Sequence, residues 1–162
     1  MWHNERTVRI DDTRLDFVPN SEPLAMLATS DWQAVCVFTM EDMLRCVSRI
    51  IELMQQAGFC GKEVFGTRLA LEEAVVNAIR HGHRNDTSKR VDVVFQVSPK
   101  QLLVEIRDQG AGFDPDGLPD PLAPENLERP GGRGVFLIRQ YMTWVQYNET
   151  GNGVTLCKVK SA

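Results

Sequence analysis

The second half of a predicted helix reads Leu71-Glu72-Glu73-Ala74-Val75-Val76-Asn77-Ala78-Ile79-Arg80-His81-Gly82. Helical periodicity extends this helix over about residues 62–81, with an apolar face that includes Phe65, Leu69, Val76 and Ile79. Glu73, Asn77 and Arg80 stand at i, i+4 and i+7, so a carboxylate, an amide and a guanidinium share one stripe of the helix. These groups suit a proton acceptor, a Mg²⁺ ligand and a phosphate contact. The plainer interpretation is a solvated helix face on which Glu73 supports Arg80.

A second polar segment, Asp108-Gln109-Gly110-Ala111-Gly112-Phe113, directly follows a predicted strand over residues 102–107. An aspartate at the end of a strand can accept a hydrogen bond from an exocyclic amine such as that of adenine. Gly110 and Gly112 would let the backbone approach a ligand closely. The alternative is an ordinary tight turn.

A third segment, Gly131-Gly132-Arg133-Gly134, opens a predicted helix from about Gly134 to Met142. Backbone N–H groups at the start of a helix form a natural phosphate site, although the same glycines could serve as a flexible linker. Residues 110–134 hold six of the twelve glycines, and residues 115–130 hold five of the eight prolines. This composition disfavours a regular element and predicts a mobile lid over residues 114–131.

The remaining periodicities predict the rest of the fold. Residues 34–38 form a strand, Thr39 and Asp42 then begin a helix with a weak capping box, and Gly58 ends that helix. Alternation over residues 91–97 and 102–107 predicts an antiparallel hairpin, and residues 143–148 and 154–159 predict another around an Asn152-Gly153 turn. Helices on one face of a mixed, mainly antiparallel sheet give an α+β fold, a two-layer α/β sandwich. The apolar face of the first helix comprises Met43, Leu44, Val47, Ile50, Ile51 and Met54.

The length of 162 residues predicts one domain, which we place at residues 34–162. Residues 1–33 form an N-terminal extension with a candidate β-hairpin over residues 7–18. A net charge of −4 argues against nucleic acid as a direct partner. With no run of 18 apolar residues and no apolar signal core, we expect a cytoplasmic protein with no membrane contact.

The cysteines and histidines do not indicate a metal site formed by their own side chains. The four cysteines form no C-x-x-C pair, which is typical of reduced thiols in a cytoplasmic protein. His81 and His83 fall at a helix C-terminus, where the helix dipole explains them more simply than a metal does.

In this order, the three polar segments resemble the motifs of the GHKL ATPase superfamily, which includes gyrase, chaperone, histidine kinase and MutL types. Residues 71–82 resemble its N box, residues 108–113 its first glycine box and residues 132–138 its second, with an ATP lid between the last two. The run E-x-x-x-N-A-x-x-H-G, from Glu73 to Gly82, and the end from Tyr147 to Leu156 are similar to the bacterial switch-protein kinases, the anti-sigma factor serine kinases. The resemblance covers residues 34–160 and implies the Bergerat ATP-binding fold.

The resemblance also implies a role for each matching residue. Glu73 would be the general base that activates a serine or threonine hydroxyl of a partner, and Asn77 would coordinate Mg²⁺ bridging the phosphates of ATP. Asp108 would bind the adenine amine. The other residues implied in nucleotide binding are Gly110 and Gly112 beside the base, Gly132, Arg133 and Gly134 at the phosphates, and Arg80, where histidine kinases often have a phosphate-contacting lysine.

One departure concerns the last strand, which the superfamily often enters with a Gly-Thr pair near adenine. Here the chain reads Gly151-Asn152-Gly153-Val154-Thr155, so that either Asn152 or Thr155 is left to take the place of that threonine.

The implied function is that of an ATP-dependent serine/threonine protein kinase and anti-sigma regulatory factor. Its substrate would be a STAS-domain anti-anti-sigma protein, and its second partner a sigma factor that it sequesters. The resemblance further implies a homodimer whose interface includes the first helix region. Two alternatives are a non-catalytic ATP-binding module, whose partner affinity is set by nucleotide, and a detached histidine-kinase catalytic domain. The presence of Glu73 favours catalysis, and its spacing from Asn77 and His81-Gly82 is closer to the switch-protein kinases.

Overall fold

The computed structural model describes residues 32–84, 86, 88–114, 117 and 133–162. The candidate hairpin over residues 7–18, nearly all of the predicted lid, and Gly132 lie outside the described residues.

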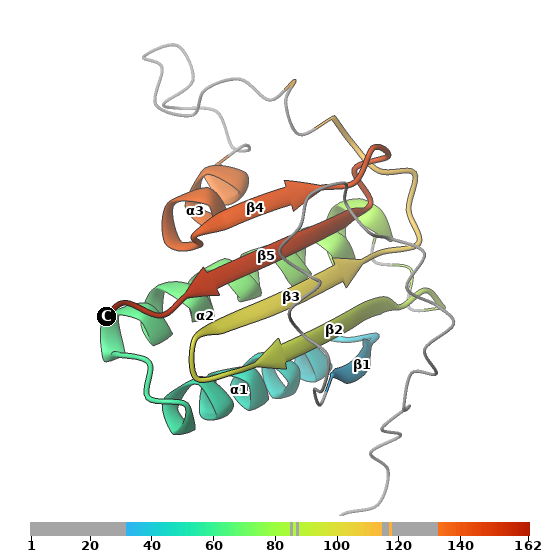
Figure 1. Ribbon diagram of the computed structural model, residues 1–162. Coiled ribbons are helices and arrows are strands. Elements are labelled where there is room, and N and C mark those ends of the chain that lie inside the picture. The colour runs from blue at the N-terminus through green and yellow to red at the C-terminus, as the bar shows by residue number, and fades with distance from the viewer. Residues whose placement is uncertain (1–31, 85, 87, 115–116, 118–132) are drawn as a thin grey trace, which may run out of the picture.

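The described elements form an α+β sandwich of two layers, as the sequence predicts (Figure 1). The strands form one sheet in the order β1-β2-β3-β5-β4. Every neighbouring pair is antiparallel, so the described sheet is wholly antiparallel, whereas a mixed, mainly antiparallel sheet was expected. Helices α1 and α2 cover one face of this sheet, and α3 lies beside β4 (Figure 1). The elements are β1 (Gln33–Val37), α1 (Met40–Gln56), α2 (Gly61–Asn77), the π-helical turn η2 (Ala78–Gly82), β2 (Val91–Val97), β3 (Gln101–Arg107), α3 (Arg133–Tyr141), β4 (Trp144–Tyr147) and β5 (Gly153–Val159).

Helix α1 begins with the predicted capping box. The Thr39 hydroxyl accepts a hydrogen bond from the Asp42 backbone at 3.1 Å, and the Asp42 carboxylate accepts one from the Thr39 backbone at 3.0 Å. These bonds satisfy N–H groups that a helix start otherwise leaves unpaired. The predicted apolar face is buried except at Leu44, which is 50% exposed, while Cys46 is buried instead.

Helix α2 buries a different face from the one predicted. Phe65, expected on its apolar face, is 61% exposed. The prediction failed because apolar residues occur all around this helix, which packs against α1 and α3, so periodicity alone could not select the buried side. The residues that it buries include Val64, Thr67, Ala70, Leu71, Ala74 and Val75.

The α-helical geometry of α2 also ends earlier than predicted, at Asn77 rather than near residue 81. The chain continues as η2, and the His83 N–H donates to the Ala78 carbonyl at 3.2 Å, five residues back. Such a π-helical turn is uncommon and often marks a functional site. Its wider turn brings Gly82 against Asp108, where a Cβ atom would overlap the carboxylate.

The last hairpin is correctly placed, but its turn is not the predicted Asn152-Gly153 pair. The Asn148 side-chain oxygen accepts hydrogen bonds from the N–H groups of Asn152 and Gly153, both at 3.1 Å. The Gly151 N–H donates to the Asn148 carbonyl at 3.1 Å. The Asn148 side chain therefore closes a longer loop, and Gly153 is already the first residue of β5.

The end of the described chain is fastened to the start of α2 by Glu63. Its buried carboxylate accepts hydrogen bonds from the N–H groups of Ser161 at 2.7 Å and Cys60 at 2.8 Å. The bond from Ser161 is the main cause that lowers the pKa of Glu63 from 4.5 to about 2. A lowered pKa stabilises the folded state above the ordinary pKa, and this contribution is lost as the pH falls from about 4.5 toward 2.

We therefore expect Glu63→Gln to lower the free energy of unfolding at pH 7 by about 1–3 kcal/mol, because one of the two N–H groups that donate to the buried carboxylate would face an amide NH₂ instead. The difference from the wild type should shrink at pH 3, where the wild-type carboxylate has lost part of its advantage. Urea denaturation at both pH values measures this, with the exposed Glu52→Gln as control. An equal loss at both pH values would contradict the assignment.

Candidate active site

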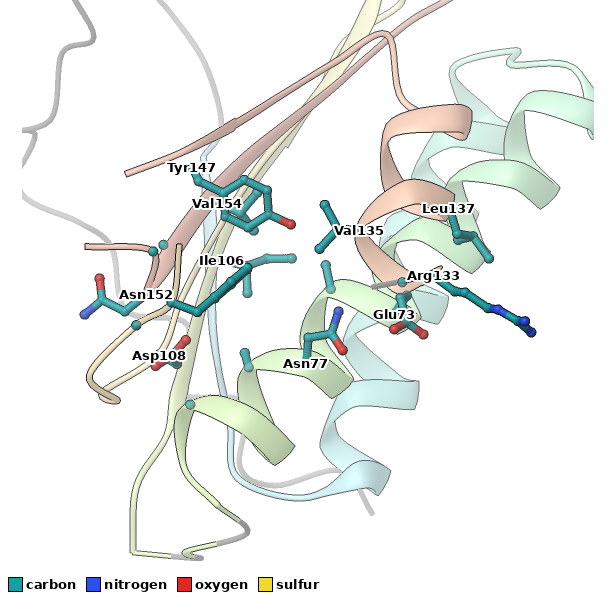
Figure 2. Close-up of a pocket in the computed structure, with 18 residues that line it drawn as sticks. Glu73, Asn77, Ile106, Asp108, Arg133, Val135, Leu137, Tyr147, Asn152 and Val154 are labelled. Carbon is teal, nitrogen blue, oxygen red and sulfur yellow. The ribbon is translucent and has the colours of Figure 1, made fainter. Parts of the chain in front are cut away.

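A cavity of about 650 Å³ lies between α2, α3 and the adjoining ends of β3 and β5 (Figure 2). This volume is typical of small-molecule sites, which span roughly 300–1,000 Å³. The walls in its middle are apolar and include Ala74, Ala78, Ile106, Val135 and Val154. The polar side chains that line it are Glu73, Asn77, Asp108, Arg133, Tyr147 and Asn152.

One end of the cavity combines α2 with the start of α3. Glu73 and Asn77 project from successive turns of α2, and Arg133 begins α3 next to Glu73 (Figure 2). Gly134 packs so closely on Glu73 that a Cβ atom there would overlap the carboxylate. The N-terminus of a helix carries partial positive charge and unpaired N–H groups, which attract anions. This end therefore offers an anion site beside a carboxylate and an amide.

Asp108 forms the other end of the cavity, just after β3. Its N–H donates to the Asn152 carbonyl at 2.9 Å, and its carboxylate accepts from the Gly110 N–H at 2.7 Å. Burial raises the pKa of Asp108 above its ordinary value, and the bond from Gly110 opposes that shift. Because the Gly110 N–H already donates to one carboxylate oxygen, the other oxygen is available to accept a hydrogen bond from a ligand.

Two glycines let the loop after β3 cross the β4–β5 loop at close range. Gly112 has φ +80° and packs on the Thr150 carbonyl, while Gly151 has φ +71° and packs on the Phe113 carbonyl. Both φ values belong to the left-handed region that favours glycine. In this structure Gly112 serves contact between two loops as well as lining the cavity.

Six of the residues predicted from sequence line this one cavity: Glu73, Asn77, Asp108, Gly112, Arg133 and Gly134. Gly110 instead faces the Gly82 carbonyl, so the close approach that it permits is to backbone. Arg80 is exposed on η2 and is not among the residues that line the cavity. Gly132 lies outside the described residues.

The structure resolves the choice of position between Asn152 and Thr155. Asn152 lines the cavity, and so does Val154. Because side chains alternate along a strand, Thr155 faces the opposite side of the sheet, in register with Glu105 and Gln146. Asn152 therefore occupies the place at the cavity, and its amide also donates to the Gly110 carbonyl at 3.3 Å.

Tyr147 is a cavity residue that the sequence analysis missed. Its hydroxyl points across the cavity toward Val135 (Figure 2), and its ring meets that of Phe113 edge-on at 5.5 Å between centroids. Burial raises the pKa of Tyr147 to about 12, so the phenol is neutral at physiological pH. The alternation of side chains along β4 could have indicated this position, because it places Val145 and Tyr147 on the face that packs on the core.

Within the described residues there is no cluster of three or more His, Cys, Asp or Glu side chains that could hold a metal ion by themselves. Asn77 fits a Mg²⁺ ion whose remaining ligands come from phosphates and water, as is common for this ion. None of the described helices is long and apolar enough to cross a membrane.

The donor set fits a nucleotide. An acceptor at one end suits an amino-bearing base, the apolar middle suits its flat ring, and a helix N-terminus with Arg133 at the other end suits phosphates. The fold and the cavity thus define a nucleotide-binding domain.

Comparison with known proteins identifies which nucleotide-binding domain this is. The histidine kinase-like ATPase domain model matches residues 37–158, a span that contains all three polar segments. The chain belongs to this family of ATP-binding domains. It is 30% identical over 114 residues to the serine-protein kinase RsbW of Staphylococcus epidermidis, covering 65% of this chain and 72% of that protein. The serine-protein kinase RsbW of Staphylococcus aureus strain JH9 is 28% identical over 114 residues, which again cover 65% of this chain and 72% of that protein.

Proposed function

We propose that this chain is a cytoplasmic, ATP-dependent serine/threonine protein kinase that phosphorylates a small STAS-type anti-anti-sigma protein. The observation that carries the proposal is the position of Glu73. Its carboxylate lies at the α3 end of the cavity, and Asp108 lies at the other end (Figure 2). The similarity to serine-protein kinases supports the same chemistry. Sequestration of a sigma factor, released when the STAS protein competes, is the second part of the proposal.

Each cavity residue then has a distinct task. When bound, Mg-ATP supplies the phosphoryl group, and the cation offsets its negative charge. Asp108 accepts a hydrogen bond from the adenine amine, and the Asn77 oxygen serves as a Mg²⁺ ligand. Arg133 and the N–H groups at the start of α3 hold phosphate oxygens. Glu73 accepts the proton of the incoming serine or threonine hydroxyl, which makes that oxygen a better nucleophile.

The alternative function is a binding module in which ATP only sets the affinity for a partner. Such a module needs Asp108 and the α3 N-terminus but no base. A half-buried carboxylate inside the cavity, next to the proposed phosphate end, favours catalysis.

The test is to incubate the protein with γ-labelled ATP, Mg²⁺ and the STAS protein encoded nearest its gene. We expect label on a serine or threonine of that protein. Nucleotide binding without transfer to any STAS candidate would favour the binding module, and acid-labile label on a histidine would favour a histidine-kinase catalytic domain.

We also propose a homodimer through the first helix region. Phe38, Met40 and Leu44, at the start of α1, are 44%, 41% and 50% exposed, so three large apolar side chains lie close together in sequence without full burial. Covering such side chains is a common reason for association.

Leu44→Glu should convert the dimer to a monomer, because a charge would be buried unpaired in the interface. Size-exclusion chromatography with light scattering measures the change. Phe65→Glu is the matched control, since Phe65 is 61% exposed but on α2, and it should leave the dimer intact. A wild-type protein that is monomeric at micromolar concentration would contradict this proposal.

A further inference from the structure

His83 is a buried histidine to which the proposed mechanism gives no task. It follows η2, is 3% exposed, and its Nε2 accepts a hydrogen bond from the Gln109 backbone N–H at 3.0 Å. A backbone N–H can only donate, so this bond requires that Nε2 carries no proton. A neutral imidazole then has its proton on Nδ1, which fixes the tautomer.

The bond holds the peptide that joins Asp108 to Gln109. From the opposite side, Asn152 holds the same loop, because its carbonyl accepts from the Asp108 N–H at 2.9 Å and its amide donates to Gly110 at 3.3 Å. The Gln109 side chain is held as well, since it accepts from the Arg90 N–H at 2.9 Å. The Asp108 backbone is therefore fixed between the end of η2 and the β4–β5 loop.

The π-helical turn makes this arrangement possible. The bond from the His83 N–H to the Ala78 carbonyl spans five residues, where an α-helix would span four. An α-helical continuation would rotate Gly82 away from the Asp108 carboxylate and His83 away from Gln109. The local departure from helical geometry and the burial of His83 thus serve the same loop.

We propose that His83 is a positioning residue for base recognition: its neutral imidazole fixes the peptide after Asp108 and so directs the carboxylate at the exocyclic amine of a bound purine. The inference rests on the nucleotide site proposed above and adds to it a residue outside the cavity lining. A purely structural role, in which the ring only fills space, is the competing explanation.

The test compares ADP with inosine diphosphate, which carries a carbonyl where adenine has its amine, by calorimetry with Mg²⁺. His83→Phe keeps a planar ring but removes the acceptor, and His83→Gln supplies an oxygen near the position of Nε2. We expect His83→Phe to bind ADP about tenfold more weakly and inosine diphosphate within about threefold of wild type. His83→Gln should restore ADP binding to within about threefold. Ser88→Ala removes a hydroxyl that donates to Asp86 in the segment between η2 and β2. It is the control and should retain the preference for ADP.

The outcomes separate this inference from the nucleotide site itself. If His83→Phe weakens both ligands equally, or leaves the preference for ADP unchanged, the positioning role is wrong while the site stands. If the wild type does not prefer ADP, the recognition of adenine by Asp108 is wrong, and the inference falls with it.

A second measurement keeps the inference testable if His83→Phe does not fold. Nitrogen-15 NMR of the wild-type imidazole rings reports the tautomer directly. We expect His83 to be protonated on Nδ1 with a bare Nε2, and a proton on Nε2 would overturn the proposal.

Discussion

Replacing Glu73 with glutamine is expected to slow phosphoryl transfer by about 10²–10⁴-fold, the usual effect of removing a general base. Glutamine keeps the size of the side chain, and therefore its packing on Gly134, but it cannot take up the proton of the acceptor hydroxyl. Affinity for Mg-ATP should stay within about threefold, because the base acts only in the transition state. Single-turnover transfer at saturating ATP, together with calorimetry, separates the two effects.

The adjacent carboxylate provides a matched control. Glu72 pairs with Arg68 at 3.4 Å and is not among the residues that line the cavity, so Glu72→Gln should transfer phosphate at close to the wild-type rate. Asn77→Ala should behave differently from both, since losing a Mg²⁺ ligand weakens nucleotide binding as well as transfer. A Glu73→Gln rate within about threefold of wild type would refute the general-base assignment.

Asp108→Asn should weaken ATP binding by about 10- to 150-fold, equivalent to the loss of a charge-assisted hydrogen bond worth about 1.5–3 kcal/mol. The Gly110 N–H donates to one carboxylate oxygen at 2.7 Å and would retain the amide oxygen of an asparagine. The amide NH₂ would then face the adenine amine, donor against donor.

Calorimetric titration measures the affinity. Asp92→Asn is the control, because Asp92 lies on β2, pairs with Arg90 at 2.8 Å and does not line the cavity. GTP should bind the wild type poorly, since guanine presents a carbonyl to Asp108. Equal affinity for ATP and GTP would contradict the adenine-binding role of Asp108.

The sequence predicted the elements of the fold where a local signal was sufficient. Thr39 and Asp42 specify the start of α1 through bonds to each other, which depend on no distant residue. The orientation of α2 was not predictable in the same way, because Phe65 is one of many apolar residues around a helix with several packed neighbours. Which of them is left exposed is decided by tertiary packing.

The same distinction holds for the site. Glu73 and Asn77 could be paired from helical spacing, and Asp108 could be joined to them only through the resemblance to a known family. The separate tasks of Gly110 and Gly112 depend on which backbone crosses each of them, and that is set by the η2 turn and the β4–β5 loop. The turn of the last hairpin also differs from the predicted Asn152-Gly153 pair. The Asn148 side chain accepts hydrogen bonds from the N–H groups of Asn152 and Gly153, and the dipeptide pattern takes no account of such bonds.

We propose that ATP lies across the cavity with its base at Asp108 and its terminal phosphate at Glu73 and the start of α3. A crystal structure with Mg²⁺ and a non-hydrolysable ATP analogue tests this most directly. We expect the adenine amine to lie within about 2.7–3.2 Å of the Asp108 carboxylate and the terminal phosphate to lie beside Gly134 and Glu73. An analogue bound in the reverse direction, or outside this cavity, would contradict it.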